Sequence, residues 1–252
     1  MIYVLRYFAI AVYTVICTTP LMVWSLIDRS GEPTVRVARV WVRWILRTIG
    51  IEVRTAGLEH LDRHNPGVVM SNHRSVFDIP ALIEVMPTTF RFVAKKELTR
   101  IPFFGWALAL SGQIIIDRSQ RSRAIHAMEE AARHITGATK VLVFPEGTRS
   151  ETHEMLPFKS GGFHLAIANG WPIFPVGIAG SDAVTPKGSL RVEPGRICMV
   201  FGEPIPTAGL AEGERRALKE RVRERVAELI SEGEALLRQE AAEAAALARL
   251  RA

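Results

Sequence analysis

Apolar and polar positions change their period along the chain, and the first change marks off an N-terminal segment. Residues 7–27 contain no charged side chain. A helix of that length would measure about 31 Å, which is close to the thickness of a bilayer core. Pro20 interrupts the run, so the pattern is compatible with a kinked or re-entrant segment as well as with a span. A cleaved signal peptide is the rival interpretation, but no A-x-A cleavage site follows.

The next segment, residues 34–50, has the period of an amphipathic helix. Four arginines recur along one predicted face: Arg36, Arg39, Arg43 and Arg47. Another face carries tryptophans and smaller side chains: Val37, Val40, Trp41, Trp44, Ile45 and Thr48. Such a helix is typical of a bilayer interface, although packing on the protein's own domain is the alternative. The pattern therefore predicts membrane-associated helices over residues 1–50.

Beyond Gly50, strand-like runs alternate with helix-like runs. The predicted strands are 51–55, 67–71, 90–94, 113–116, 140–144, 173–178, 190–192 and 196–201. The predicted helices are 79–86, 103–110, 121–135, 162–169 and a charged tail from Glu212. This alternation predicts an α/β fold, with a mixed, largely parallel sheet flanked by helices and preceded by the N-terminal segment. We expect a catalytic domain over residues 51–230 and a charged, Ala-rich helical tail over 231–252.

Charge narrows the class of partner. The chain of 252 residues carries a net charge of +6, and residues 1–50 alone contribute +4. Basic residues beside an apolar segment favour an anionic bilayer surface as partner. Nucleic acid is disfavoured, because the sequence has no zinc-finger spacing, RNA-binding aromatic motif or basic tail. The two cysteines, Cys17 and Cys198, cannot build a disulfide framework, which favours a cytosolic setting.

The stretch GVVMSNHRSVFDIP, residues 67–80, places candidate chemistry at the end of a predicted strand. Ligands of α/β sheets bind beyond the carboxyl ends of strands, so His73 should lie at the ligand edge. His73 and Asp78 can meet only if His73 lies in the turn and Asp78 near the start of the next helix. There Asp78 either caps that helix or accepts a hydrogen bond from the imidazole, which would leave Nε2 free as a base.

Two further strand ends should reach the same edge of the sheet. The stretch KVLVFPEGTRS, residues 140–150, ends in a turn that contains Glu146, Gly147, Thr148 and Arg149. A glycine lets the backbone approach a ligand closely, and a guanidinium suits bidentate contact with a phosphate. The stretch GQIIIDRS, residues 112–119, ends its strand at Asp117 and Arg118. A solvated strand end with an ion pair explains any one of these turns, but explains all three together less well.

No metal site is expected from the spacing of the remaining histidines. None of them forms an H-E-x-x-H motif, and they lie at His60, His64, His126, His134, His153 and His164. The sequence also lacks a G-x-S-x-G nucleophile elbow.

Taken together, these stretches resemble the glycerolipid acyltransferase family. Four of them fit the family's motifs in order: residues 72–78 as N-H-x-x-x-x-D, 112–118, 144–149 and 172–176. Two connecting stretches are also similar to the family: AKKELTRIPFFG at 94–105 and LPFKSGGFHLA at 156–166. The resemblance extends over residues 34–205 and is strongest to bacterial members that acylate 1-acyl-glycerol 3-phosphate.

The resemblance implies acyl transfer from acyl-CoA or acyl-carrier protein to the free sn-2 hydroxyl of lysophosphatidic acid, giving phosphatidic acid. It implies that His73 is the general base and that Asp78 holds its ring. Arg149 and Arg118, with Lys95, would hold the acceptor phosphate, in a loop formed by Gly147 and Thr148. Glu146 would bind a glycerol hydroxyl or position Arg149. Neither a metal nor another cofactor is implied.

The Arg-rich N-terminal segment predicts a location on the cytoplasmic face of the inner membrane, held monotopically or by a single anchor. Three alternatives stay open. The same chemistry could use another acceptor, such as glycerol 3-phosphate, another lysophospholipid or a lyso-aminolipid. A thioester hydrolase would not need the phosphate-binding arginines. A non-catalytic membrane-binding protein would not need His73 with Asp78.

Overall fold

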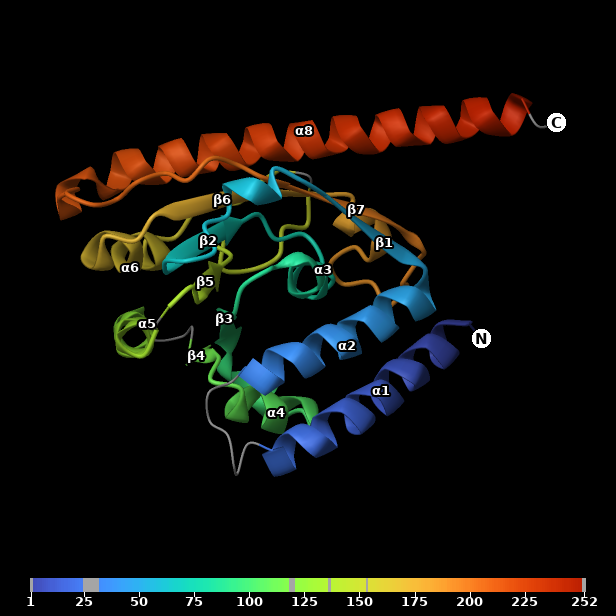
Figure 1. The fold of residues 1–252 in the computed structure, drawn as a ribbon, viewed down its shortest axis with the longest axis horizontal. Coiled ribbons are helices and arrows are strands. Elements are labelled where there is room, and N and C mark those ends of the chain that lie inside the picture. The colour runs from blue at the N-terminus through green and yellow to red at the C-terminus, as the bar shows by residue number, and fades with distance from the viewer. Residues whose placement is uncertain (1, 25–31, 118–120, 136, 153, 251–252) are drawn as a thin grey trace.

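The computed structural model describes residues 2–24, 32–117, 121–135, 137–152 and 154–250 (Figure 1). Its helices are α1 Ile2–Trp24, α2 Glu32–Ile49, α3 Asp78–Val85, α4 Phe104–Leu110, α5 Arg121–Arg133, α6 Gly161–Asn169, α7 Ser181–Val184 and α8 Arg215–Leu250. Its strands are β1 Ile51–Ala56, β2 Gly67–Ser71, β3 Phe90–Lys95, β4 Ile114–Ile116, β5 Lys140–Val143, β6 Ile173–Ala179 and β7 Gly195–Phe201.

The strands form a single sheet in the order β1-β7-β6-β2-β5-β3-β4. All neighbouring strands run parallel except β6 and β7, which are antiparallel. The predicted mixed, largely parallel sheet is therefore confirmed. The central strands β2 and β6 are buried at every position, which is why they appear in the sequence as uninterrupted apolar runs.

Helices cover both faces of the sheet. Alternate residues of β2 point to opposite sides, so Val69 joins the core cluster that contains α2 and α3. Val68 and Met70 join a second cluster, with side chains from α5, α6 and α8. The catalytic residues expected from the sequence lie at the edge between these two layers, beyond the carboxyl ends of β2 and β5.

Helix α2 packs on its own domain, which was the alternative for this amphipathic segment. Its buried face contributes Val42 and Ile49 to the core beneath the sheet. Its arginines are partly used by the protein itself. Arg39 donates to the carbonyl of Met86, and Arg43 pairs with Glu84 at 3.0 Å. The arginine stripe therefore does not face lipid as a whole.

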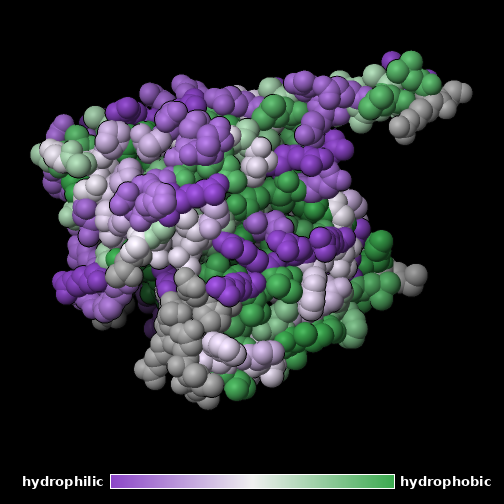
Figure 2. Space-filling model, viewed as in Figure 1, coloured by the Kyte–Doolittle hydropathy of each residue, from purple (hydrophilic) through white to green (hydrophobic). Residues whose placement is uncertain are grey.

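The tryptophan side of α2 faces α1 rather than lipid alone. Trp41 Nε1 donates to Thr14 Oγ1 at 3.1 Å, and the rings of Tyr13 and Trp44 lie 5.5 Å apart. Helix α1 contains Pro20 and is long and apolar enough to cross a membrane. Its outer side remains exposed, and Figure 2 shows hydrophobic residues gathered along this edge of the molecule.

Helix α8 lies across the strands β6 and β7 and extends past the body of the molecule (Figure 1). The close approach depends on Gly177 of β6, because a Cβ there would overlap the backbone of Leu229 and Ile230. The helix continues without a break through residue 230, where the sequence suggested that a separate tail begins.

The strand predicted at 190–192 is wrong. These residues lie in the loop that connects α7 to β7, and only Val192 is buried among them. The apolar run is short, and a charged residue, Arg191, interrupts it. A run of this length cannot be separated from a loop by its pattern alone.

Candidate active site

The turn after β2 and the turn after β5 meet because these strands are parallel neighbours. Asn72 fixes the first turn to the sheet, since its side chain donates to the carbonyl of Ile178 and accepts from the Ile178 amide, both at 2.8 Å. Ser150 N donates to His73 O at 2.9 Å and so ties the second turn to the first.

Asp78, the first residue of α3, holds the first turn in place through its side chain. It is completely buried. Its Oδ2 atom accepts three hydrogen bonds, from His73 Nδ1 at 2.7 Å, Arg74 N at 2.8 Å and Ser75 N at 2.9 Å. Bonds to an ionised acceptor are the stronger kind. The contact expected from the five-residue spacing is therefore present, and Asp78 bonds back to the turn rather than forward into α3.

The imidazole of His73 is fixed on two sides. Its ring stacks on Phe144, with centroids 4.1 Å apart and planes inclined by 22°. Because Nδ1 is bonded to a carboxylate, the neutral ring carries its proton there and leaves the lone pair on Nε2. The side chain is 15% exposed, and no described residue bonds to Nε2. A substrate hydroxyl can therefore approach this nitrogen.

Glu146 joins the His73 turn to the loop that precedes α6. Its Oε1 atom accepts from His73 N at 2.7 Å, and Oε2 accepts from Leu156 N at 2.8 Å. Burial raises the pKa of this carboxyl, and the two backbone donors partly offset that rise. The expected contact between Glu146 and Arg149 is not among the interactions of the described residues.

The loop from Gly147 to Arg149 carries one cationic side chain, Arg149, and lies beside a second, Lys159. Gly147 has φ 74, and a Cβ on it would meet Lys159 Nζ at 2.5 Å. Lys159 N donates to Pro145 O at 2.7 Å, which fixes the lysine's backbone against the loop. Arg149 is half-buried. Among the described residues, neither Arg149 nor Lys159 has an acidic partner, whereas Thr148 is exposed beside them.

The other expected phosphate-binding residues are less closely placed. Lys95 ends β3 and forms an exposed ion pair with Glu97 at 3.2 Å. Arg118 lies outside the described residues. Two residues of this site were not expected from the sequence: Phe144, which was assigned to the strand, and Lys159. Each lies within a stretch that resembles the family, and that place in the sequence is what could have indicated them.

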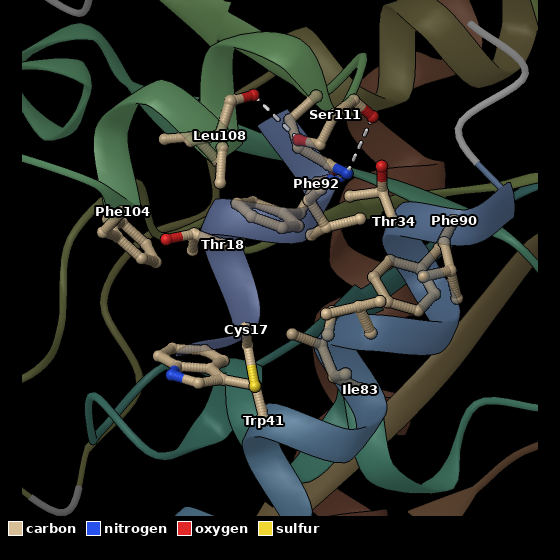
Figure 3. A pocket seen from close by; sticks show the side chains of 16 residues that line it. Cys17, Thr18, Thr34, Trp41, Ile83, Phe90, Phe92, Phe104, Leu108 and Ser111 are labelled. Atoms are coloured by element: carbon tan, nitrogen blue, oxygen red, sulfur yellow. Dashed lines mark hydrogen bonds between the residues drawn. The ribbon is translucent and has the colours of Figure 1, made fainter. Parts of the chain in front are cut away.

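An apolar pocket lies between the N-terminal helices and the sheet (Figure 3). Figure 3 shows side chains of α1, α2, α3, β3 and α4 around it, including Cys17, Trp41, Phe92 and Phe104. Phe90, the first residue of β3, also lines it, so the pocket reaches the amino end of that strand.

The histidines outside the His73 turn lie apart from the candidate site or outside the described residues. No group of three or more His, Cys, Asp or Glu side chains among the described residues is arranged to hold an ion. His164 bonds to Glu129 at 2.9 Å on a partly exposed surface. His153 lies outside the described residues.

Comparison with known proteins agrees with this geometry. Residues 52–179 match the family model described as acyltransferase. The chain is 38% identical over 189 residues to 1-acyl-sn-glycerol-3-phosphate acyltransferase alpha of Bos taurus, covering 75% of this chain and 66% of that protein. It is 36% identical over 201 residues to 1-acyl-sn-glycerol-3-phosphate acyltransferase of Saccharomyces cerevisiae, covering 77% of this chain and 65% of that protein. The chain thus spans slightly less than two thirds of these relatives.

A solved structure is similar over nearly the whole chain. It is the crystal structure of the 1-acyl-sn-glycerophosphate (LPA) acyltransferase PlsC from Thermotoga maritima, with a TM-score of 0.78 and 28% identity. The likeness covers 92% of this chain and 94% of that one.

Proposed function

The chain belongs to the acyltransferase family, and on that basis we propose that it acylates the free sn-2 hydroxyl of 1-acyl-glycerol 3-phosphate, giving phosphatidic acid. The relatives reported above are named for this reaction. The observation in the site that carries the proposal is the 2.7 Å bond from His73 Nδ1 to buried Asp78, while Nε2 bonds to no described residue.

The reaction needs one base and no covalent enzyme intermediate. Neutral His73 takes the hydroxyl proton on Nε2 while the hydroxyl oxygen attacks the thioester carbon. The tetrahedral intermediate then expels the thiolate, which regains a proton from the imidazolium. Asp78 stabilises that imidazolium through its bond to Nδ1. General base catalysis of this kind contributes about 10²–10⁴-fold to the rate.

Arg149 and Lys159 are the proposed phosphate-binding pair. Lys159 lies against Gly147 and Arg149 belongs to the same turn, which is bonded to the His73 turn through Ser150 and Glu146. A guanidinium can make two parallel bonds to phosphate, and an ammonium adds a compact charge. Lys95 and Arg118 remain candidates for further contacts. Glu146 supports this arrangement by holding backbone N–H groups rather than by touching phosphate.

The donor is a thioester of coenzyme A or of acyl-carrier protein, and no metal or redox cofactor takes part. Its acyl chain, or that of the acceptor, suits the apolar pocket lined by Phe92, Phe104 and Trp41. A chain whose carbonyl lies at His73 would run along the sheet to reach it. The five residues of β2 span about 17 Å.

We place the enzyme on a membrane, with α1 as the anchor and the active site on the cytoplasmic face of the inner membrane. Helix α1 exposes large apolar side chains along its outer side, among them Val4, Phe8 and Val23. The positive charge of residues 1–50 favours anionic lipid on the same side.

The test is acyl transfer by purified protein, with labelled acyl-CoA and labelled acyl-carrier protein supplied separately. The acceptors are 1-acyl-glycerol 3-phosphate, glycerol 3-phosphate, lysophosphatidylcholine and water alone. We expect labelled phosphatidic acid from the first acceptor and none from His73→Ala. Release of free fatty acid at the same rate without acceptor would make the protein a hydrolase. Preferred labelling of another acceptor would replace the proposed substrate.

A further inference from the structure

The loop from Thr185 to Pro194, here called the 185–194 loop, exposes a leucine at its tip. Leu190 is 78% exposed, and among the large apolar side chains that the structure describes only Leu250 is more exposed, at 85%. Gly188 in the same loop has φ 81, a conformation that favours glycine. A single exposed leucine is ordinary on a protein surface, so its meaning depends on the side chains beside it.

Helix α1 holds this loop along its first two turns. Tyr3 donates to the Glu193 carboxylate and Arg6 to the carbonyl of Val192. The Tyr7 hydroxyl donates to the carbonyl of Leu190 itself, at 2.9 Å. These three bonds join segments more than 180 positions apart in the sequence. The loop and the start of α1 therefore form one surface.

That surface carries apolar side chains from α1 and two charged side chains from the loop, Arg191 and Glu193. Val4, Leu5 and Phe8 are 71%, 59% and 68% exposed, and the helical period places them on the side of α1 away from Tyr3, Arg6 and Tyr7. Arg191 is exposed next to Leu190 and makes no ion pair among the described residues. An apolar surface bordered by an unpaired cation fits the boundary between acyl chains and anionic headgroups.

The other end of the loop borders the candidate active site. Ser75 Oγ donates to the carbonyl of Thr185 at 3.0 Å, and Ser75 N is one of the donors to Asp78. Lys187 pairs at 3.0 Å with Glu151, which follows the turn bonded to His73. The 185–194 loop thus reaches from α1 to the catalytic turn.

We propose that the 185–194 loop is a membrane-contact element of the active-site entrance. Leu190 enters the surface of an anionic bilayer together with Val4 and Phe8, while Arg191 binds the headgroups. An acceptor lipid then passes from the bilayer to His73 along this loop. The entrance role rests on the proposed function, whereas the membrane contact does not.

The test is fluorescence from a single labelled site. Leu190→Cys is labelled with an environment-sensitive fluorophore, since the native thiols Cys17 and Cys198 are buried at 7% and 1% exposure. Leu250→Cys is the matched control, since it is also highly exposed but lies at the far end of α8. With vesicles containing phosphatidylglycerol, we expect a blue shift at position 190 and none at position 250.

Vesicle binding and turnover complete the test. Leu190→Ser should bind anionic vesicles roughly tenfold more weakly, and Leu250→Ser should not. The turnover of Leu190→Ser should fall more for an acceptor embedded in vesicles than for one dispersed in detergent. Unchanged emission at position 190 on protein that sediments with vesicles would overturn the proposal. A shift that depends on protein concentration without vesicles would also overturn it, in favour of a second copy. The fluorescence needs no turnover, so it separates this proposal from failure of the proposed function.

Discussion

Replacing Asp78 by Asn separates a catalytic role of this carboxylate from a merely structural one. A single oxygen, Oδ2, accepts from the His73 ring and from two backbone N–H groups. An asparagine can keep an oxygen at that point, so the turn can persist. It loses the negative charge beside the imidazole, and that charge matters most when the ring becomes positive during proton transfer.

The expected loss follows from this geometry. Loss of most of the general base contribution would lower kcat by about 10²–10⁴-fold, which is about 2.7–5.5 kcal/mol in the barrier. The ground-state bonds weaken from charge-assisted to neutral, a change of about 1 kcal/mol each. The neutral asparagine also avoids the free-energy cost of burying a charge, and this offsets part of the loss. The free energy of unfolding should therefore change less than the activation barrier.

The assay is single-turnover acyl transfer at saturating acceptor, with urea unfolding of the same protein. Asp62→Asn is the matched control, because Asp62 also accepts backbone and side-chain bonds, from His64 N at 2.7 Å and Asn65 Nδ2 at 2.9 Å. It lies in the turn before β2, away from His73, and should leave turnover unchanged. Turnover of folded Asp78→Asn within threefold of the parent would refute the orienting role.

Three further predictions follow from contacts in and beside the site. Arg149→Lys and Lys159→Met should each raise the acceptor KM by about 10–100-fold, with Lys219→Met on α8 as control; equal KM values would remove the pair from the phosphate site. Glu146→Gln should destabilise the fold by about 1–3 kcal/mol and reduce kcat, because the new amide NH₂ group would face a backbone N–H donor of His73 or Leu156. Chemical denaturation measures the first effect and turnover measures the second. Gly177→Ala should cost about 1–3 kcal/mol in thermal unfolding, because a Cβ would overlap Ile230, whereas Gly213→Ala, which has no atom within 4 Å, should not.

Strand positions were predictable because the sheet is buried on both faces. The runs at β2 and β6 have no polar face, and a continuous apolar run bounded by turns is the mark of such a strand. The carboxyl-edge rule then brought His73 and Glu146 to the same place without any structure. Only the contact itself, and which oxygen of Asp78 makes it, needed coordinates.

The environment of α2 was not predictable in the same way. An amphipathic pattern states that one face is buried, but it does not state whether lipid, α1 or the sheet covers that face. Trp41 proved to bond to Thr14, a contact between two segments that each looked suited to a membrane. The strand predicted at 190–192 was wrong for a related reason. An apolar residue such as Leu190 has the same local pattern in a loop as in a short strand.

The two buried carboxylates of the site bond to backbone N–H groups rather than to the cations proposed to bind phosphate. Three consecutive backbone N–H groups, of His73, Arg74 and Ser75, donate to Glu146 and Asp78. Asp78 Oδ1 has no hydrogen-bond partner among the described residues, Glu146 Oε2 accepts from Leu156 N, and neither carboxylate forms an ion pair with Arg149 or Lys159. Groups fixed before substrate binds need little reorganisation during the reaction. The fold thus uses its buried negative charge to orient the base and leaves its positive charge available to an anionic substrate.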